Sequence, residues 1–302
     1  MTSGAQEAGS ALPQAPSLPT RQRKFSFAWL GVLPFFAYVA TFLLVPSIWL
    51  VVGAFQTDSG AFTTVQVHTL FQQQYLDAYK TSIEISLASA LIGGVCGLFV
   101  AYSAVKEGAP GWIRPLLTTF SGVAANFAGI PLAFAWVATL GTTGVITAFL
   151  ANHGIDLYQH GFTLYSFTGL TVVYTYFQMP LMILVISPAL DGVRTEWREA
   201  ATNLGAGQLQ FWRYVGIPIL WPSLLGAFVL LFGSAFAAYA TAAALVGTEL
   251  NLVPLLIGNV VNGNNTSDPQ FGDALALGMI VIIGFTVVLN ILLQRRSDRW
   301  LR

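Results

Sequence analysis

The residues best suited to chemistry lie between Glu196 and Pro218, in the stretch EWREAATNLGAGQLQFWRYVGIP. Here the carboxylates of Glu196 and Glu199 flank the guanidinium of Arg198, although only 9% of the residues in the chain are charged. Long apolar runs precede and follow the stretch. A carboxylate in such a place can form an ion pair with a partner or accept a hydrogen bond from it. The stretch therefore suggests recognition of another molecule.

The sequence offers little for a metal centre or for ATP hydrolysis. Cys96 is the only cysteine, so no intrachain disulfide and no cysteine cluster can form. His68, His153 and His160 are scattered through polar stretches, which indicates loop histidines rather than a zinc site. The sequence contains no G-x-x-x-x-G-K-[ST] phosphate-binding loop. We therefore expect a protein that is not an enzyme and binds neither a metal nor a cofactor.

The composition predicts a protein that lies in a membrane. Of the 302 residues 55% are hydrophobic, and the mean hydropathy is +0.67. A soluble domain would be about a quarter charged, so this chain could not cover its surface in water. The formal net charge is zero, which gives no indication of nucleic-acid binding.

Six apolar runs are long enough for membrane helices, which need about 20 residues each. Runs of this length exclude barrel strands, which take about ten, so we expect an all-α polytopic membrane protein. The first run is too long and too aromatic for a signal peptide. The composition of residues 1–24 predicts a disordered cytoplasmic tail. Residues 25–302 are expected to form a transmembrane domain. The predicted spans are 27–55, 81–105, 115–140, 163–187, 219–247 and 273–293.

Lysine and arginine predict the orientation, because they favour the cytoplasmic side. Of the 13 such residues, Lys80 alone falls outside the set formed by the N-terminus, the 106–114 turn, the 188–218 loop and the C-terminus. Both termini and the 188–218 loop are therefore expected in the cytoplasm.

The loop itself predicts two short helices. Ser187 and Pro188 suggest an N-cap followed by proline at the first helical position. Gly205 suits the left-handed residue that ends a helix. The first helix would carry one apolar stripe, formed by Trp197, Ala200, Ala201 and Leu204.

The second short helix is expected at 207–215, with Leu209 and Trp212 on its apolar side and Pro218 ending it. Such a module suits docking to another protein, because alanines allow close approach. The alternative is an amphipathic helix lying on the lipid headgroups.

The same stretch resembles the EAA loop of permease subunits of ABC importers. The family pattern is E-A-A, three residues, G, nine residues, I, one residue and L-P. This chain departs from it only by exchanging one branched aliphatic residue for another, at Val215 and Ile217. The matching residues are Glu199, Ala200, Ala201, Gly205, Val215, Ile217 and Pro218.

The resemblance covers about residues 25–300 and implies a type I importer permease in the bacterial inner membrane. Two such subunits, identical or related, would form the pathway through the lipid bilayer. Two cytoplasmic ATPase subunits would clamp the loops, and a binding protein outside would deliver the substrate. ATP hydrolysis would belong to the separate ATPase chains. The residues implied in ATPase coupling are Glu199, Ala200, Ala201, Leu204, Gly205 and Pro218.

Polar groups inside the predicted spans are candidates for the substrate pathway, since they are costly in lipid and usually face a cavity or another helix. For Asn126 and Gln178 the alternative is hydrogen bonding between helices, and for the tyrosines it is packing. The candidates are Asn126, Tyr174, Gln178, Tyr239 and Thr241.

The segments FAAYATAAALVG and NLVPLLIGN resemble spermidine/putrescine-type permeases and their aminophosphonate and iron relatives. This resemblance implies a small charged solute such as a polyamine or an aminophosphonate. Two other functions stay open from the residues alone. An ion-coupled secondary transporter would show inverted repeats and an embedded carboxylate, and a membrane scaffold would recruit a cytoplasmic partner without transport.

Overall fold

The computed structural model describes residues 28–57, 59–105, 110–263 and 269–298, so the predicted tail at 1–24 lies outside the described residues. Apart from one isolated bridge between Gln56 and Phe62, the described residues form helices and turns. This confirms the all-α prediction. Six helical segments are long and apolar enough to span a membrane: Gly31–Gly53, Gln73–Val105, Ile130–Asn152, Phe167–Asp191, Gln208–Phe236 and Pro269–Arg295.

The first segment is helical from α1 (Ala28–Val39) through η1 (Ala40–Leu44) to α2 (Val45–Gly53). η1 is a π-turn that ends two residues before Pro46. Proline lacks an N–H and clashes with the carbonyl four residues earlier, and a wider turn relieves both problems. Residues 1–47 form one unit and residues 48–302 a second, compact one.

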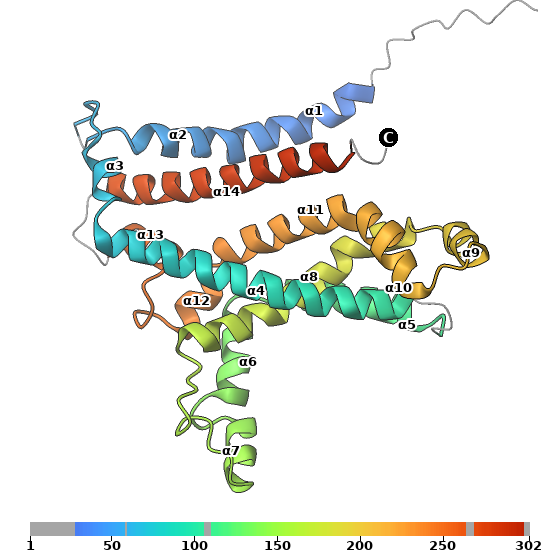
Figure 1. Cartoon of the computed structure of the whole chain (residues 1–302). Helices are drawn as coiled ribbons and strands as arrows, with labels where there is room; N and C mark the ends of the chain where they lie inside the picture. The colour runs from blue at the N-terminus through green and yellow to red at the C-terminus, as the bar shows by residue number, and fades with distance from the viewer. Residues whose placement is uncertain (1–27, 58, 106–109, 264–268, 299–302) are drawn as a thin grey trace, which may run out of the picture. The chain divides into compact units, whose positions relative to one another are not determined.

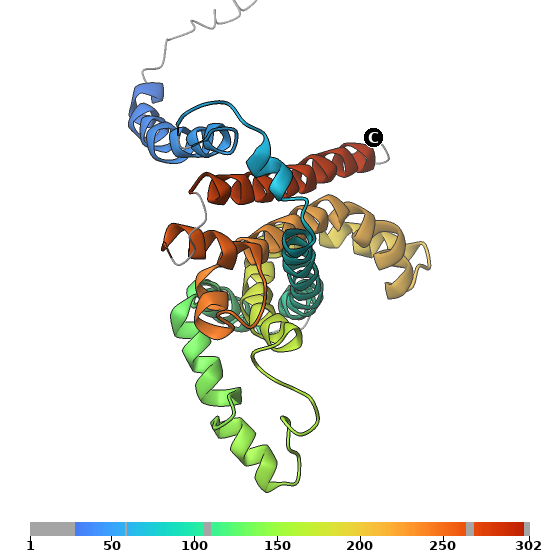
Figure 2. The same ribbon diagram turned by 90° about the vertical axis from the view of Figure 1, so that its left-hand side faces the viewer.

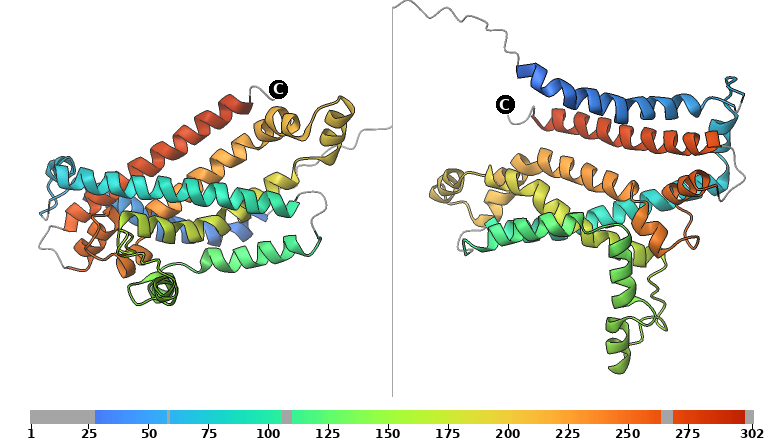
Figure 3. Two further views of the ribbon diagram at one scale, coloured as in Figure 1. Left: turned by 60° about the horizontal axis from the view of Figure 1, so that its bottom comes forward. Right: turned by 180° about the vertical axis from the view of Figure 1, so that it is seen from behind.

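The second unit is a bundle of long helices, seen side by side in Figures 1 and 3. α4 packs most extensively on α8, and α11 packs on α4, α8 and α14. The long helices are α4 (Gln73–Val105), α5 (Ile113–Asn126), α8 (Phe167–Asp191), α11 (Ile217–Phe236) and α14 (Pro269–Asp298), with the short α3 (Val65–Thr69) before α4.

Glycines bring α4 and α8 into close contact. A Cβ at Gly97 would lie 2.6 Å from the carbonyl oxygen of Met179 and 2.7 Å from Cβ of Met182. A Cβ at Gly93 would overlap the side chain of Gln178. Small residues four apart give two helices this close approach in a membrane.

The prediction of a single third span at 115–140 is wrong. α5 ends at Asn126, and a new helix, α6 (Ile130–Leu140), runs across the direction of the bundle and leads into α7 (Val145–Asn152) (Figures 1 and 2). Phe127 is the C-cap residue of α5, and Gly129, with φ +75°, is the N-cap residue of α6, whose first turn contains Pro131. The chain therefore breaks completely between α5 and α6, just before Pro131.

The predicted fifth span, 219–247, is also wrong at both ends. The chain is helical from α10 (Gln208–Phe211) through η2 (Trp212–Gly216) to the end of α11 at Phe236. After a break at 237–239 come α12 (Ala240–Leu245) and α13 (Val253–Val261). The first three residues of α13, Val253, Pro254 and Leu255, are buried.

One end of the second unit carries the predicted loop, and we call it the loop end. α4 ends there, α5 begins there, and α8 and α14 end there, whereas α3 and α13 lie at the opposite end (Figure 1). The ends of α4, α8 and α14 and the start of α5 therefore lie at one end of the second unit.

Candidate functional site

The first helix of the loop, α9, spans Thr195–Asn203. The predicted start at Ser187 and Pro188 is wrong, because α8 continues through both residues to Asp191. The Ser187 hydroxyl donates to the carbonyl of Ile183, 2.5 Å away, so it satisfies the helix it belongs to instead of capping a new one. Only three residues, 192–194, separate α8 from α9.

The turn after α9 is a Schellman motif built on Gly205, whose φ of +79° confirms the predicted left-handed conformation. The Ala206 N–H donates to the Ala201 carbonyl, and the Gly205 N–H to the Thr202 carbonyl, both at 2.9 Å. These bonds satisfy carbonyls at the end of α9 and fix the direction in which the chain leaves it.

The second helix begins at Gln208, after the Gly207 N–H donates to Oε1 of Gln210 at 2.8 Å. Pro218 does not end this helix as predicted, since it lies in the first turn of α11 and the helix continues to Phe236. As at Pro46, a π-turn, η2, ends two residues before the proline and makes room for its ring.

Aromatic contacts anchor the second helix to the bundle. Phe211 is 2% exposed, and the guanidinium of Arg198 in α9 lies 5.8 Å from its ring centroid. Trp212 meets Tyr102 of α4 edge to face, with centroids 5.0 Å apart. α9 and α10 are thereby held to each other and to α4.

The outer surface of this loop is apolar and uncovered. Leu204 is 88% exposed and Leu209 83%, one on each side of Gly205. The predicted stripe of Trp197, Ala200, Ala201 and Leu204 is exposed or half-exposed along its length. The Glu199 side chain is exposed, and no hydrogen bond or ion pair is recorded for it within the described residues. The loop thus exposes two leucines and a carboxylate on its surface.

An ion pair that the sequence analysis missed joins two helices at the loop end. The Arg114 guanidinium at the start of α5 contacts the Asp191 carboxylate at the end of α8. Both side chains are about a third to a half exposed, and such pairs contribute at most about 1 kcal/mol. The residues are 77 positions apart, so no local pattern indicates the pairing.

Two of the predicted pathway residues are buried between helices. Gln178 is fully buried, and its Nε2 donates to the carbonyl of Leu231 in α11 at 2.9 Å. Tyr174 is 3% exposed, and its hydroxyl donates to the carbonyl of Ala238 at 2.9 Å. Gln178 thus bonds from α8 to α11, as its alternative interpretation describes, and Tyr174 bonds from α8 to the break after α11.

The remaining three lie at helix ends. Thr241 joins the two breaks: its Oγ1 accepts from the Gly129 N–H at 2.8 Å and donates to the Gly129 carbonyl at 3.3 Å. Tyr239 is 41% exposed, with its hydroxyl 3.4 Å from Nδ2 of Asn262. Asn126 is the exposed last residue of α5 rather than a mid-span residue, and it bonds back to Gly122 at 2.7 Å.

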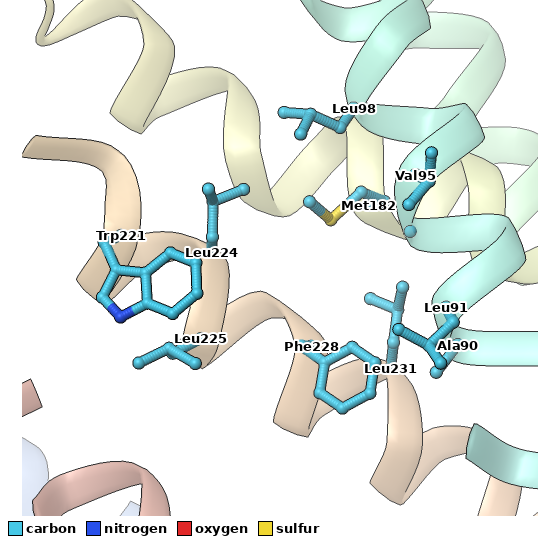
Figure 4. A pocket seen from close by; sticks show the side chains of 11 residues that line it. Ala90, Leu91, Val95, Leu98, Met182, Trp221, Leu224, Leu225, Phe228 and Leu231 are labelled. Atoms are coloured by element: carbon cyan, nitrogen blue, oxygen red, sulfur yellow. The ribbon is translucent and has the colours of Figure 1, made fainter. Parts of the chain in front are cut away.

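An apolar cavity of about 310 Å³ lies between α4, α8 and α11 (Figure 4). Leu91, Met182, Trp221 and Phe228 are among the residues that line it. Because its wall offers no charged side chain, it suits a hydrocarbon chain better than a polar solute.

No protein-family model matches the chain, but curated proteins do. The sulfate transport system permease protein CysT of Salmonella typhimurium is 28% identical over 163 residues, which are 53% of this chain and 54% of that protein. CysW of Synechococcus elongatus, also named for sulfate transport, is 23% identical over 266 residues, 87% of each chain. The spermidine/putrescine permease protein PotB of Haemophilus influenzae is 24% identical over 284 residues, 90% of this chain and 97% of that one. The chain thus spans about half of the first relative and most of the other two.

Solved structures share the helix arrangement. A bacterial ABC transporter that imports the acidic polysaccharide alginate matches with a TM-score of 0.70 and 19% identity, covering 89% of this chain and 95% of that one. The alginate transporter in complex with a periplasmic protein bound to alginate pentasaccharide matches with a TM-score of 0.64 and 17% identity, over 91% and 94% of the two chains.

Proposed function

From the premise that this chain is a homologue of ABC importer permease subunits and shares their type I fold, we propose that its loop between α8 and α11 couples a separate ATPase to the translocation pathway. The observation that carries the proposal is the uncovered surface around Gly205, with Leu204 and Leu209 exposed at the residues where the motif of the family falls. In water such a surface is costly, and a partner that covers it gains about 1.5–3 kcal/mol per leucine.

The connections of the loop support a mechanical role. The segment from Gln208 to Phe236 is helical throughout, so a displacement of α10 moves α11 with it. On the other side, the short link at 192–194 ties α9 to α8. Both α8 and α11 pack on α4, so force on the loop reaches the core of the bundle.

The proposed assembly contains two cytoplasmic ATPase subunits, a second permease subunit and a binding protein outside. The loop and both termini face the cytoplasm, as the distribution of lysine and arginine indicates. In this assembly the ATPase packs on Glu199, Ala200 and Ala201, and the Glu199 carboxylate accepts a hydrogen bond from it. The relatives' names favour this assembly over an ion-coupled transporter or a scaffold.

The proposed substrate is a small charged solute such as a polyamine or an aminophosphonate. One relative is named for an anion, sulfate, and another for cations, spermidine and putrescine. All of these named solutes are small and charged. The candidate pathway residues are uncharged, so we assign the choice between solutes to the binding protein.

The test is ATP hydrolysis by the complete complex in lipid. Purified chain should bring down an ATPase subunit, and hydrolysis should rise when the cognate binding protein and its ligand are added. Titrating that binding protein with spermidine, an aminophosphonate and sulfate identifies the substrate class. Tight binding of a neutral sugar alone would reject the proposed substrate. An ATP hydrolysis rate that does not change when the binding protein is added would reject the proposal that the chain belongs to an importer.

A further inference from the structure

The segment formed by α6 and α7, residues 130–152, is called the arm here, and the inference about it rests on the proposed function. We propose that the arm is the surface on which the second permease subunit packs. The arm runs crosswise from the bundle in Figures 1 and 2 and in the right view of Figure 3.

The arm lies at the depth of the hydrocarbon layer. Trp112 and Arg114 mark the membrane boundary at the loop end, where α5 begins. α5 has 14 residues and at about 1.5 Å per residue reaches only about 21 Å, whereas the hydrocarbon layer is about 30 Å thick. α6 therefore starts inside the layer and, because it turns crosswise, stays near that depth.

The arm exposes an apolar surface with no charge in its sequence. On α6 the exposed residues Ile130, Phe134 and Ala138 follow a four-residue spacing and form one stripe. On α7, Val145 is 74% exposed and Phe149 60%. Lipid or protein could cover such side chains equally well, so the stripe alone does not decide between them.

The backbone between α6 and α7 indicates that protein, and not lipid, covers the arm. Thr142 and Thr143 are exposed and lie outside any helix, and no hydrogen bond of their N–H groups or hydroxyls is recorded within the described residues. In hydrocarbon each such group is costly, so irregular backbone at this depth has to be covered by protein or face a water-filled passage. A second permease subunit that shares the pathway supplies both.

The arm is large enough to form part of such an interface. Of its 23 residues, 12 are exposed, whereas one side of a stable protein interface has about 20–30 residues, so neighbouring elements have to contribute the rest. Between α5, α6, α7 and α8 lies a hollow of about 340 Å³, lined by Phe127, Trp136, Ile146 and Tyr176 among others. A two-fold interface uses the same surface of both subunits, and the exposed stripe and the hollow lie on one such surface.

The experiment places the photoreactive amino acid p-benzoylphenylalanine at Phe134 and, separately, at Phe149, in the full transporter in native membranes. The matched control is Phe285 of α14, 68% exposed, in a helix away from the arm. We expect illumination to join this chain to a second permease chain, identified by its peptides, from Phe134 and Phe149 but not from Phe285. ATPase co-purification is measured in the same samples.

Adducts with lipid or with the binding protein alone at both arm positions would overturn the inference, as would equal permease adducts from Phe285. If the ATPase co-purifies while the arm forms no permease adduct, the arm is not the interface and the proposed function stands. If neither is found, the proposed function fails as well.

Discussion

Gly205 is the residue on which the presentation of the loop depends, because its left-handed backbone turns the chain between Leu204 and Leu209. This feature could be predicted from the sequence, since helix-ending glycines act locally. The partners of Gln178 and Thr241 could not be predicted, because they lie 53 and 112 residues away. The sequence indicated polar side chains in apolar runs, and the structure shows their partners: Gln178 bonds to Leu231 of α11 and Tyr174 to Ala238 after α11.

A valine at Gly205 should uncouple the loop without preventing insertion. A side chain at φ +79° is strained by at least about 1 kcal/mol, although a Cβ there meets nothing within 4 Å in this chain. We expect Gly205→Val to reach the membrane in normal amounts and to lose uptake. Gly205→Asn, which tolerates the left-handed region, is the control and should retain most uptake. Equal uptake by both variants and the parent would show that uptake does not depend on the left-handed turn at residue 205.

Gln178→Met should leave stability nearly unchanged or raise it. The substitution removes a bond to Leu231 worth about 0.6 kcal/mol on average in membranes. It also removes the Oε1 atom, which is buried and has no hydrogen-bond partner in the described residues, and such an atom costs roughly 1–3 kcal/mol. The melting temperature in detergent, together with uptake, measures the outcome. Abolished uptake in a stable variant would instead place Gln178 in the substrate pathway.

At the scale of helices, the apolar runs predicted how many segments there are but not where they break. Gly129 and Pro131 were visible in the sequence, yet hydropathy stays high through 130–152 and hides the change of direction. Hydropathy indicates that a segment prefers hydrocarbon to water, but it does not indicate in which direction the chain runs. The same limit explains why the end of α11 at Phe236 was missed.

The packing of α4 on α8 can be tested with two neighbouring glycines. A Cβ at Gly93 would overlap Gln178, whereas a Cβ at Gly94 would lie 3.5 Å from Cδ2 of Leu231, an ordinary contact. We expect Gly93→Ala to destabilise the chain by about 1–3 kcal/mol and Gly94→Ala to have little effect. Thermal unfolding of both purified variants checks this. A larger loss for Gly94→Ala would show that the glycines do not set the spacing of α4 and α8.

For the whole molecule, the distribution of charge gave an orientation that the fold alone does not determine. It can be tested by thiol labelling on a Cys96→Ser background. A cysteine at Gln159, which is exposed and close to Asp156, should react in intact cells with an impermeant reagent. A cysteine at Thr195, in α9, should react only after the cells are opened. The reverse pattern would place the loop outside and exclude an ATPase as its partner.

The most direct test of the central claim is the affinity of the cognate ATPase for the chain in lipid nanodiscs, measured with Leu204→Ser and Leu209→Ser combined. The control is Val65→Ser, an exposed apolar residue in α3 at the opposite end of the second unit. Burial of a leucine is worth about 1.5–3 kcal/mol and each 1.4 kcal/mol is tenfold, so we expect the double variant to bind at least about 100-fold more weakly. The control should bind like the parent. Parental affinity in the double variant would contradict the claim that this loop is where the ATPase docks.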